Sequence, residues 1–234
     1  MTPNQVTLAR VGMAFVAVAL FGRGGWPANL TALGLTVAAI ALDAVDGYLA
    51  RRKNLATPLG AQLDILGDRV IENVFFTYFA VCGAISLWVP VIFFVRGTLT
   101  DFLRALAAKE GRVGFGKNSM LESRWAQMLV ASRASRFAYG ALKCACFCYL
   151  GFERTLLRPT AGTVLAADWT ATLLLGAQVI VAATVAFCLV RGVPVLWEGR
   201  RYFTALAQAA PRTSAASVRR AATLRVGSAA GAVR

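Results

Sequence analysis

Six long apolar segments follow one another along the chain, near residues 5–22, 29–50, 58–85, 87–108, 129–152 and 168–195. Each is long enough to cross a bilayer as a helix, and residues 29–50 alone would form a helix of about 33 Å. Apolar runs of this length that recur along a whole chain are typical of polytopic membrane proteins. The pattern predicts an all-α integral membrane protein with six transmembrane helices in a single domain.

Composition supports a membrane domain. Hydrophobic residues make up 58% of the 234 residues and charged residues 15%, whereas a soluble domain carries about 25% charged residues. After Trp197 the apolar pattern stops, and Ala, Ser and Arg dominate. We therefore expect residues 1–198 to form the membrane domain and residues 199–234 to form a basic, flexible cytoplasmic tail.

The formal net charge of +14 comes from 25 basic and 11 acidic residues. The basic residues gather after the second, fourth and sixth segments, while the alternate connections hold few. This distribution follows the positive-inside rule and suits anionic lipid head groups, so it favours membrane lipids over nucleic acid as the partner. The sequence thus predicts a multi-pass protein of a bacterial inner membrane with both termini in the cytoplasm.

Acidic residues concentrate in one short interval, at Asp43, Asp46, Asp64, Asp68 and Glu72. Their neighbours are apolar, and a carboxylate at membrane depth is costly enough that it usually marks a functional site. On a helix Asp43 lies about 60° from Asp46. Asp64 and Asp68 share a face because they are four residues apart. A short turn between the two helices would bring both faces together, and four convergent carboxylates need divalent cations or raised pKa values.

The ligand chemistry of this cluster indicates which cation it would hold. The chain contains no histidine, and the four aspartates offer only oxygen ligands. Hard oxygen ligands select Mg²⁺, Mn²⁺ or Ca²⁺ over zinc or copper. Two metal ions bridged by aspartates suit phosphoryl transfer, because they neutralise phosphate charge and align the nucleophile with the leaving group. Arg51 adds a fork-shaped donor suited to a diphosphate.

The residues of the cluster also resemble a known signature. Asp43-Ala-Val-Asp46-Gly47-Tyr-Leu-Ala50-Arg51, then eight residues, Gly60, three residues, Asp64, three residues and Asp68 resemble the complete signature of the CDP-alcohol phosphatidyltransferases. The resemblance implies a six-helix membrane fold, usually a homodimer, with a polar cavity that faces the cytoplasm. It also implies an enzyme that displaces CMP from a CDP-linked lipid, here CDP-diacylglycerol, by the hydroxyl group of a second substrate.

Residue roles follow from the same resemblance. Asp43, Asp46, Asp64 and Asp68 resemble the carboxylates that bind two divalent ions, Mg²⁺ or Mn²⁺, and Asp68 also resembles the proposed general base. Gly47, Ala50, Arg51 and Gly60 resemble the positions that line the cytidine-diphosphate site. The physical chemistry agrees, since small residues permit close approach of a ligand and arginine binds phosphate.

Two further stretches, Pro3–Arg10 and Arg96–Arg104, resemble the phosphatidylglycerophosphate synthase branch of the family. That branch implies glycerol 3-phosphate as the acceptor alcohol. The chain departs from the branch at Gly97, where glutamate is usual, and at Arg69, where lysine is frequent. Inositol phosphate, serine or another alcohol therefore stay open as acceptors in the same chemistry.

A phosphorylated acceptor would need cations at the mouth of the cavity. The candidates are Arg104 and Arg133, followed by Arg96 and Lys143. Such residues can instead snorkel at the interface and serve the inside-positive topology. Asp101 and Glu72 are expected to pair with neighbouring basic residues.

A protein of another class could also carry membrane aspartates, namely a divalent-cation transporter. Transporters tend to show repeated halves or interrupted helices in both halves. The acidic residues here lie mostly in one half of the chain, so the pattern favours the transferase.

Overall fold

The computed structural model describes residues 3–52, 58–109, 111–112, 119–157 and 167–209. Every regular element in these ranges is helical, which confirms the all-α prediction. The elements are α1 (Pro3–Arg23), α2 (Trp26–Arg52), α3 (Pro58–Val81), α4 (Trp88–Lys109), α5 (Arg124–Ala126), the π-helix η1 (Gln127–Ala131), α6 (Arg133–Leu157) and α7 (Ala167–Ala209).

Glycines in the left-handed conformation end two of the helices that carry charged side chains into the bundle. Gly83 follows α3 with φ 75°, and Gly111 follows α4 with φ 72°. After α3, the N–H of Gly83 donates to Ala80 O and the N–H of Ala84 donates to Phe79 O. The same pair of bonds follows α4 and forms a Schellman motif, which satisfies the last carbonyl groups of each helix.

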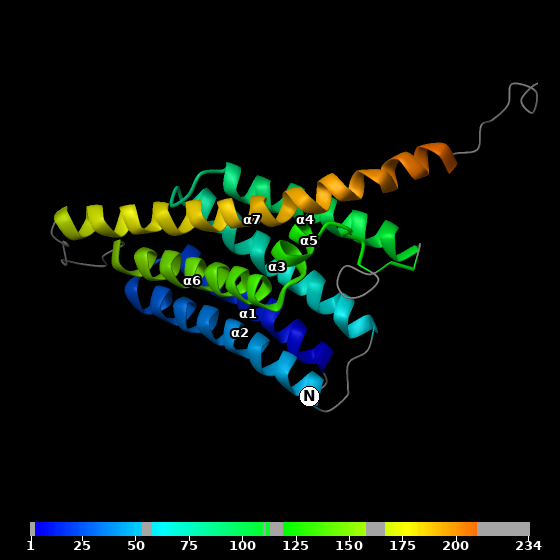
Figure 1. Cartoon of the computed structure of the whole chain (residues 1–234). Helices are drawn as coiled ribbons and strands as arrows, with labels where there is room; N and C mark the ends of the chain where they lie inside the picture. Colours follow the sequence, from blue (N-terminus) through cyan, green and yellow to red (C-terminus); the bar gives the residue numbers. More distant parts are fainter. Residues whose placement is uncertain (1–2, 53–57, 110, 113–118, 158–166, 210–234) are drawn as a thin grey trace, which may run out of the picture.

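The six long helices pack as a closed ring in the order α1, α2, α6, α7, α4, α3 and back to α1. Figure 1 shows them side by side, with α7 the longest and extending past the others. Aromatic side chains fill the centre of the ring. Phe76 lies 4.4 Å from Phe93 and 4.8 Å from Phe147 between ring centroids, so α3 is locked to α4 and α6 by the same side chain.

A second, smaller core joins the ends of α4 and α7 to the chain between α4 and α6. It contains nine buried residues: Leu103, Leu106, Ala107, Met120, Leu121, Ala126, Val130, Val195 and Tyr202. The segment that carries four of them, residues 119–132, is called the connector below. Because the connector supplies buried apolar side chains, it is part of the packed structure and not a surface loop.

The long helices agree with the six predicted segments and differ from them by four or more residues at four ends, one of which is the end of α6 at Leu157. α3 ends at Val81, because the Schellman turn stops it before residue 85. α6 begins at Arg133, because residues 124–131 form α5 and η1. α7 continues to Ala209, past the predicted domain boundary at residue 198. Residues 210–234 of the predicted tail lie outside the described residues.

Among the described residues, two stretches are long and apolar enough to cross a membrane, Asn4–Arg23 in α1 and Trp169–Tyr202 in α7. Trp26–Leu42 in α2 is a shorter apolar stretch. The other long helices carry more charged residues, for example Arg96, Asp101 and Arg104 in α4. These charges lower the mean hydropathy of the helices that bear them.

Candidate active site

Asp64 and Asp68 of α3 share one guanidinium group, that of Arg10 in α1. Arg10 Nη1 lies 3.3 Å from Asp64 Oδ1, and Arg10 Nη2 lies 3.1 Å from Asp68 Oδ1. The arginine side chain is 5% exposed, whereas the two aspartate side chains are 51% and 47% exposed. The two carboxylates are thus half-exposed, whereas the guanidinium group that pairs them is buried.

A close approach of α1 to α3 positions this group. Gly67 has no side chain, and a Cβ atom there would lie 2.8 Å from Thr7 Cγ2. Thr7 and Arg10 share a face of α1, three residues apart, while Gly67 directly precedes Asp68. The contact of glycine with threonine therefore sets the distance at which Arg10 reaches both aspartates.

A cavity of about 100 Å³ opens beside the pair. Arg10, Asp68, Glu72 and Lys143 supply its charged groups, and small and apolar residues of α2, α3 and α6 supply the rest of its wall. Asp68 thus faces a space enclosed by four helices. The buried Glu72, one turn further along α3, faces the same space.

A chain of ion pairs leads from this cavity to α4. Lys143 Nζ lies 3.6 Å from Glu72 Oε1, and Arg69 Nη1 lies 3.1 Å from Glu72 Oε2. Arg69 also binds both oxygens of Asp101, at 2.9 and 3.3 Å. Arg104 Nη1 completes the chain, 3.1 Å from Asp101 Oδ1. The expected pairing of Asp101 and Glu72 with basic residues is confirmed.

Cations from three helices surround the ring of Tyr139. Lys143 Nζ lies 4.9 Å from the ring centroid, Arg191 Cζ 5.2 Å and Arg96 Cζ 5.6 Å. Arg96 and Arg191 are both buried, and the Nε atom of each makes no hydrogen bond within the described structure. An aromatic face attracts cations. Lys143 is also paired with Glu72, whereas Arg96 and Arg191 form no ion pair with the described carboxylates. The group is therefore suited to an anion.

The predicted site residues differ in burial and in their contacts. Gly60 is half-buried in the first turn of α3, and Arg104 belongs to the ion-pair chain. Arg133 is exposed at the start of α6. The helix α2 includes the other predicted positions, but their side chains lie outside the described residues: Asp43, Asp46, Gly47, Ala50 and Arg51.

Sequence reasoning missed the roles of Tyr139 and Arg191. Arg191 lies in a stretch otherwise apolar enough to span a membrane, and an isolated arginine in such a stretch is a signal of function. From the sequence, Arg10 stands out only as the end of the stretch Pro3–Arg10. Neither its burial nor its aspartate partners on α3 follow from spacing, because the contact joins residues more than 50 positions apart.

The described part of the site fits a divalent cation. Two carboxylates already converge on one positive group, and both are about half-exposed. Oxygen ligands of this kind suit Mg²⁺ and Mn²⁺. Within the described part of the chain, no set of three or more acidic, cysteine or histidine side chains forms a ligand group. The side chains of Asp43 and Asp46, two of the four predicted aspartates, are not among those described.

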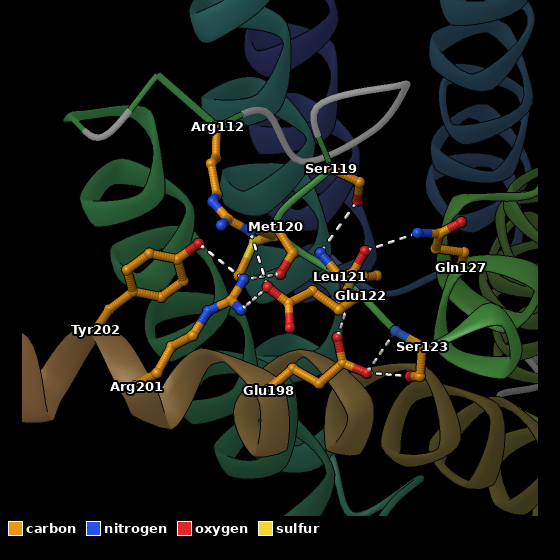
Figure 2. Close-up of polar contacts among 10 residues, drawn as sticks. All are labelled: Arg112, Ser119, Met120, Leu121, Glu122, Ser123, Gln127, Glu198, Arg201 and Tyr202. Atoms are coloured by element: carbon orange, nitrogen blue, oxygen red, sulfur yellow. Dashed lines mark hydrogen bonds and ion pairs between the residues drawn. The ribbon is translucent and has the colours of Figure 1, made fainter.

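The connector is fastened to α7 by one carboxylate (Figure 2). Glu198 Oε2 accepts a hydrogen bond from the N–H of Glu122 at 2.6 Å. Glu198 Oε1 accepts bonds from the N–H of Ser123, at 3.4 Å, and from its hydroxyl group. These donors lie directly before α5, so Glu198 ties the chain that enters this short helix to α7.

Arg201 forms the second half of this attachment. It donates to Met120 O at 2.6 Å and also to Glu122 Oε1, which Arg112 binds at 3.0 Å. The guanidinium groups of Arg201 and Arg112 hold the pKa of Glu122 below its ordinary value. The contribution of Glu122 to stability is therefore present near neutral pH and is lost as the pH falls through that lowered pKa.

Arg191 holds the other end of the connector. Its guanidinium group donates to Leu129 O at 3.3 Å, to Val130 O at 3.0 Å and to the hydroxyl of Ser135. These carbonyl groups belong to η1, and a cation that binds the last carbonyl groups of a helix is favourable. Arg191 and Glu198 are seven residues apart and share one face of α7. One face of α7 thus fixes both ends of the connector and carries a cation of the Tyr139 group.

Comparison with known proteins agrees with this geometry. Residues 1–190 match the CDP-alcohol phosphatidyltransferase family. The chain is 28% identical over 142 residues to CDP-diacylglycerol--glycerol-3-phosphate 3-phosphatidyltransferase of Bacillus subtilis, which covers 56% of this chain and 74% of the relative. It is 31% identical over 111 residues to a probable phosphatidylglycerophosphate synthase of Mycobacterium tuberculosis, with 46% and 53% covered.

A third relative is named for a different product. The chain is 38% identical over 90 residues to phosphatidylinositol phosphate synthase of Corynebacterium glutamicum, which covers 37% of this chain and 36% of the relative. The chain thus spans about half or less of two of these three relatives. The family match covers most of the chain. The protein belongs to the CDP-alcohol phosphatidyltransferase family, as the signature from Asp43 to Asp68 predicts. It is accordingly an enzyme of the phosphatidyltransferase class.

Replacement of Glu198 by alanine tests the attachment of the connector. The variant leaves two backbone N–H groups and one hydroxyl without their acceptor, which should lower the free energy of unfolding by about 1–3 kcal/mol. Thermal unfolding of the detergent-solubilised protein measures this loss. Glu198→Gln retains one acceptor oxygen and should lie between Glu198→Ala and the unaltered protein. Equal midpoints for all three proteins would show that the attachment does not contribute.

Proposed function

We propose that the protein transfers a phosphatidyl group from CDP-diacylglycerol to glycerol 3-phosphate and releases CMP. The observation that carries this proposal is the position of Asp64 and Asp68 within a complete family signature. Both carboxylates contact one buried guanidinium group, and Asp68 lines a cavity bounded by α1, α2, α3 and α6. Two relatives named for phosphatidylglycerophosphate synthesis support the choice of acceptor.

In the proposed reaction Asp68 accepts the proton of the acceptor hydroxyl, since its carboxylate faces the cavity. The hydroxyl oxygen then bonds to the phosphorus that bears the diacylglycerol, and the phosphoanhydride bond to CMP breaks. Asp43, Asp46, Asp64 and Asp68 would hold two divalent ions, Mg²⁺ or Mn²⁺, which neutralise the charge of the diphosphate when bound. Gly47, Ala50, Arg51 and Gly60 would line the CDP site.

The charge of the interior supports a phosphorylated acceptor. The connected groups around Glu72 and Tyr139 contain five cations, Arg69, Arg96, Arg104, Lys143 and Arg191, and two carboxylates, Glu72 and Asp101. Among the described side chains this set has a net charge of +3. Buried charges are costly unless they are paired, so a phosphomonoester at this place would be favourable. Arg104 would contact the acceptor from α4, and Arg133 would contact it from the exposed first turn of α6.

We also propose that all six long helices cross the membrane, with both termini, the turn between α2 and α3 and the cavity on the cytoplasmic side. Large apolar side chains point outward from several helices, for example Phe15, Phe94 and Leu175. Such a surface suits contact with lipid, while the charges of α3 and α4 pair with one another. A homodimer is the assembly that the family resemblance implies.

Removal of divalent cations tests the chemistry. In the presence of CDP-diacylglycerol and glycerol 3-phosphate, excess EDTA should abolish CMP release, and Mg²⁺ should restore it. Asp64→Asn should lower the rate about 100-fold or more, because loss of a direct metal ligand costs more than loss of a supporting contact. Glu122→Gln, which changes an exposed carboxylate of the connector, is the matched control and should keep most of the rate. Full activity in EDTA would contradict the proposal.

A panel of acceptors tests the second substrate. Glycerol 3-phosphate should give the largest kcat/KM, ahead of inositol phosphate, serine and free inositol. Arg104→Ala should raise the KM for glycerol 3-phosphate about tenfold, the effect of losing a charge-assisted hydrogen bond, and should leave the KM for CDP-diacylglycerol nearly unchanged. Arg133→Ala should have the smaller effect, since Arg133 is exposed. Efficient use of serine, with no response to glycerol 3-phosphate, would overturn the assignment.

A further inference from the structure

Arg10 places a positive charge where the metal-binding carboxylates converge. Its two Nη atoms lie 3.3 and 3.1 Å from Oδ1 of Asp64 and Asp68. We propose that Arg10 is an internal counter-ion of this pair, which holds the metal-free site together and competes with the divalent cation for the same carboxylates. The proposal rests on the assignment of Asp64 and Asp68 as metal ligands in the proposed function.

The metal-free site needs such a cation for an electrostatic reason. Asp64 and Asp68 lie one helical turn apart on the same face of α3, and like charges at this spacing repel. The guanidinium fork of Arg10 contacts one oxygen of each, so a single group offsets the repulsion. Arg10 itself is 5% exposed, and a buried guanidinium is stable only while its charge is paired. Arg10 and the pair of aspartates therefore stabilise each other.

A divalent ion at these carboxylates would meet the charge of Arg10 at short range. Metal–oxygen distances are about 2.0–2.1 Å for Mg²⁺, so the ion and the guanidinium would lie within a few ångströms of each other. Arg10 cannot simply withdraw with its helix, because Thr7 packs against Gly67 one turn away. Its side chain must lose at least part of its contact with the carboxylates, or the metal must bind against a like charge. In both cases Arg10 weakens metal binding.

Titration of the purified protein with MnCl₂ alone, after removal of metal by EDTA, measures the competition without any substrate. Arg10→Ala and Arg10→Gln should bind Mn²⁺ about tenfold more tightly than the unaltered protein, because a like charge has been removed. Arg10→Lys keeps the charge and should stay close to the unaltered protein. Arg23→Ala, at the exposed end of the same helix, is the matched control and should change nothing.

Thermal unfolding supplies a second readout that does not depend on activity. In EDTA, Arg10→Ala and Arg10→Gln should unfold at a lower temperature than the unaltered protein, because the repulsion of Asp64 and Asp68 is no longer offset. Saturating Mn²⁺ should remove most of this difference. A loss that stays equal with and without Mn²⁺ would mean that Arg10 serves packing only, and this would overturn the proposal.

Weaker Mn²⁺ binding by both neutral variants would also overturn it, since Arg10 would then organise the metal site instead of competing with the metal. Mn²⁺ binding that is unchanged in both neutral variants would likewise overturn the proposal. These outcomes are distinct from failure of the proposed function, which appears as absence of CMP release by the unaltered protein with metal and both substrates. Asp64→Asn should lose Mn²⁺ binding in the same titration, which ties the measured ion to the aspartate pair.

Discussion

The contact of Arg10 with Asp64 and Asp68 is the interaction on which the rest of the site depends. Carboxylates inside an apolar helical bundle are unfavourable unless an opposite charge lies beside them. The fold provides that charge from α1, and the absence of a side chain at Gly67 lets α1 approach α3 closely enough. The same approach leaves the carboxylates half-exposed above the guanidinium, where a cavity begins. The neutralisation of two acids by one guanidinium group therefore also holds the two carboxylates side by side, as the proposed metal site requires.

The second half of the site follows from α7 and the connector. Arg191 binds the carbonyl groups of η1, and Glu198 binds the N–H groups before α5, so one face of α7 holds both ends of the connector. Arg191 also approaches the ring of Tyr139 together with Lys143 and Arg96. The connector thus shares an arginine with the group of cations that suits an anionic substrate. In the proposed function the donor would be bound by α2 and α3, and the acceptor by α4, α6 and α7.

The sequence predicts the helices well because the apolar segments are long and are separated by turn residues and charge. It misplaces the end of α3, since a Schellman turn at Gly83 is not visible in an apolar period, and the extent of α7, since Ala-rich and Arg-rich residues are compatible with a helix as well as with a tail. The aspartates from Asp43 to Asp68 are predictable because their spacing is local. The roles of Arg10 and Arg191 are not, because each depends on a partner far away in the chain. Of the two acceptor candidates, Arg104 lies in the ion-pair chain, whereas Arg133 lies on the exterior.

Location of the metal relative to Arg10 tests this account most directly. An anomalous difference map from crystals of the protein grown with Mn²⁺ and CDP would show the ion itself. The account predicts a peak at coordinating distance, about 2.2 Å, from carboxylate oxygens of both Asp64 and Asp68, with the Arg10 guanidinium withdrawn from at least one of them. A map in which Arg10 keeps both contacts and the Mn²⁺ peak lies elsewhere would contradict it.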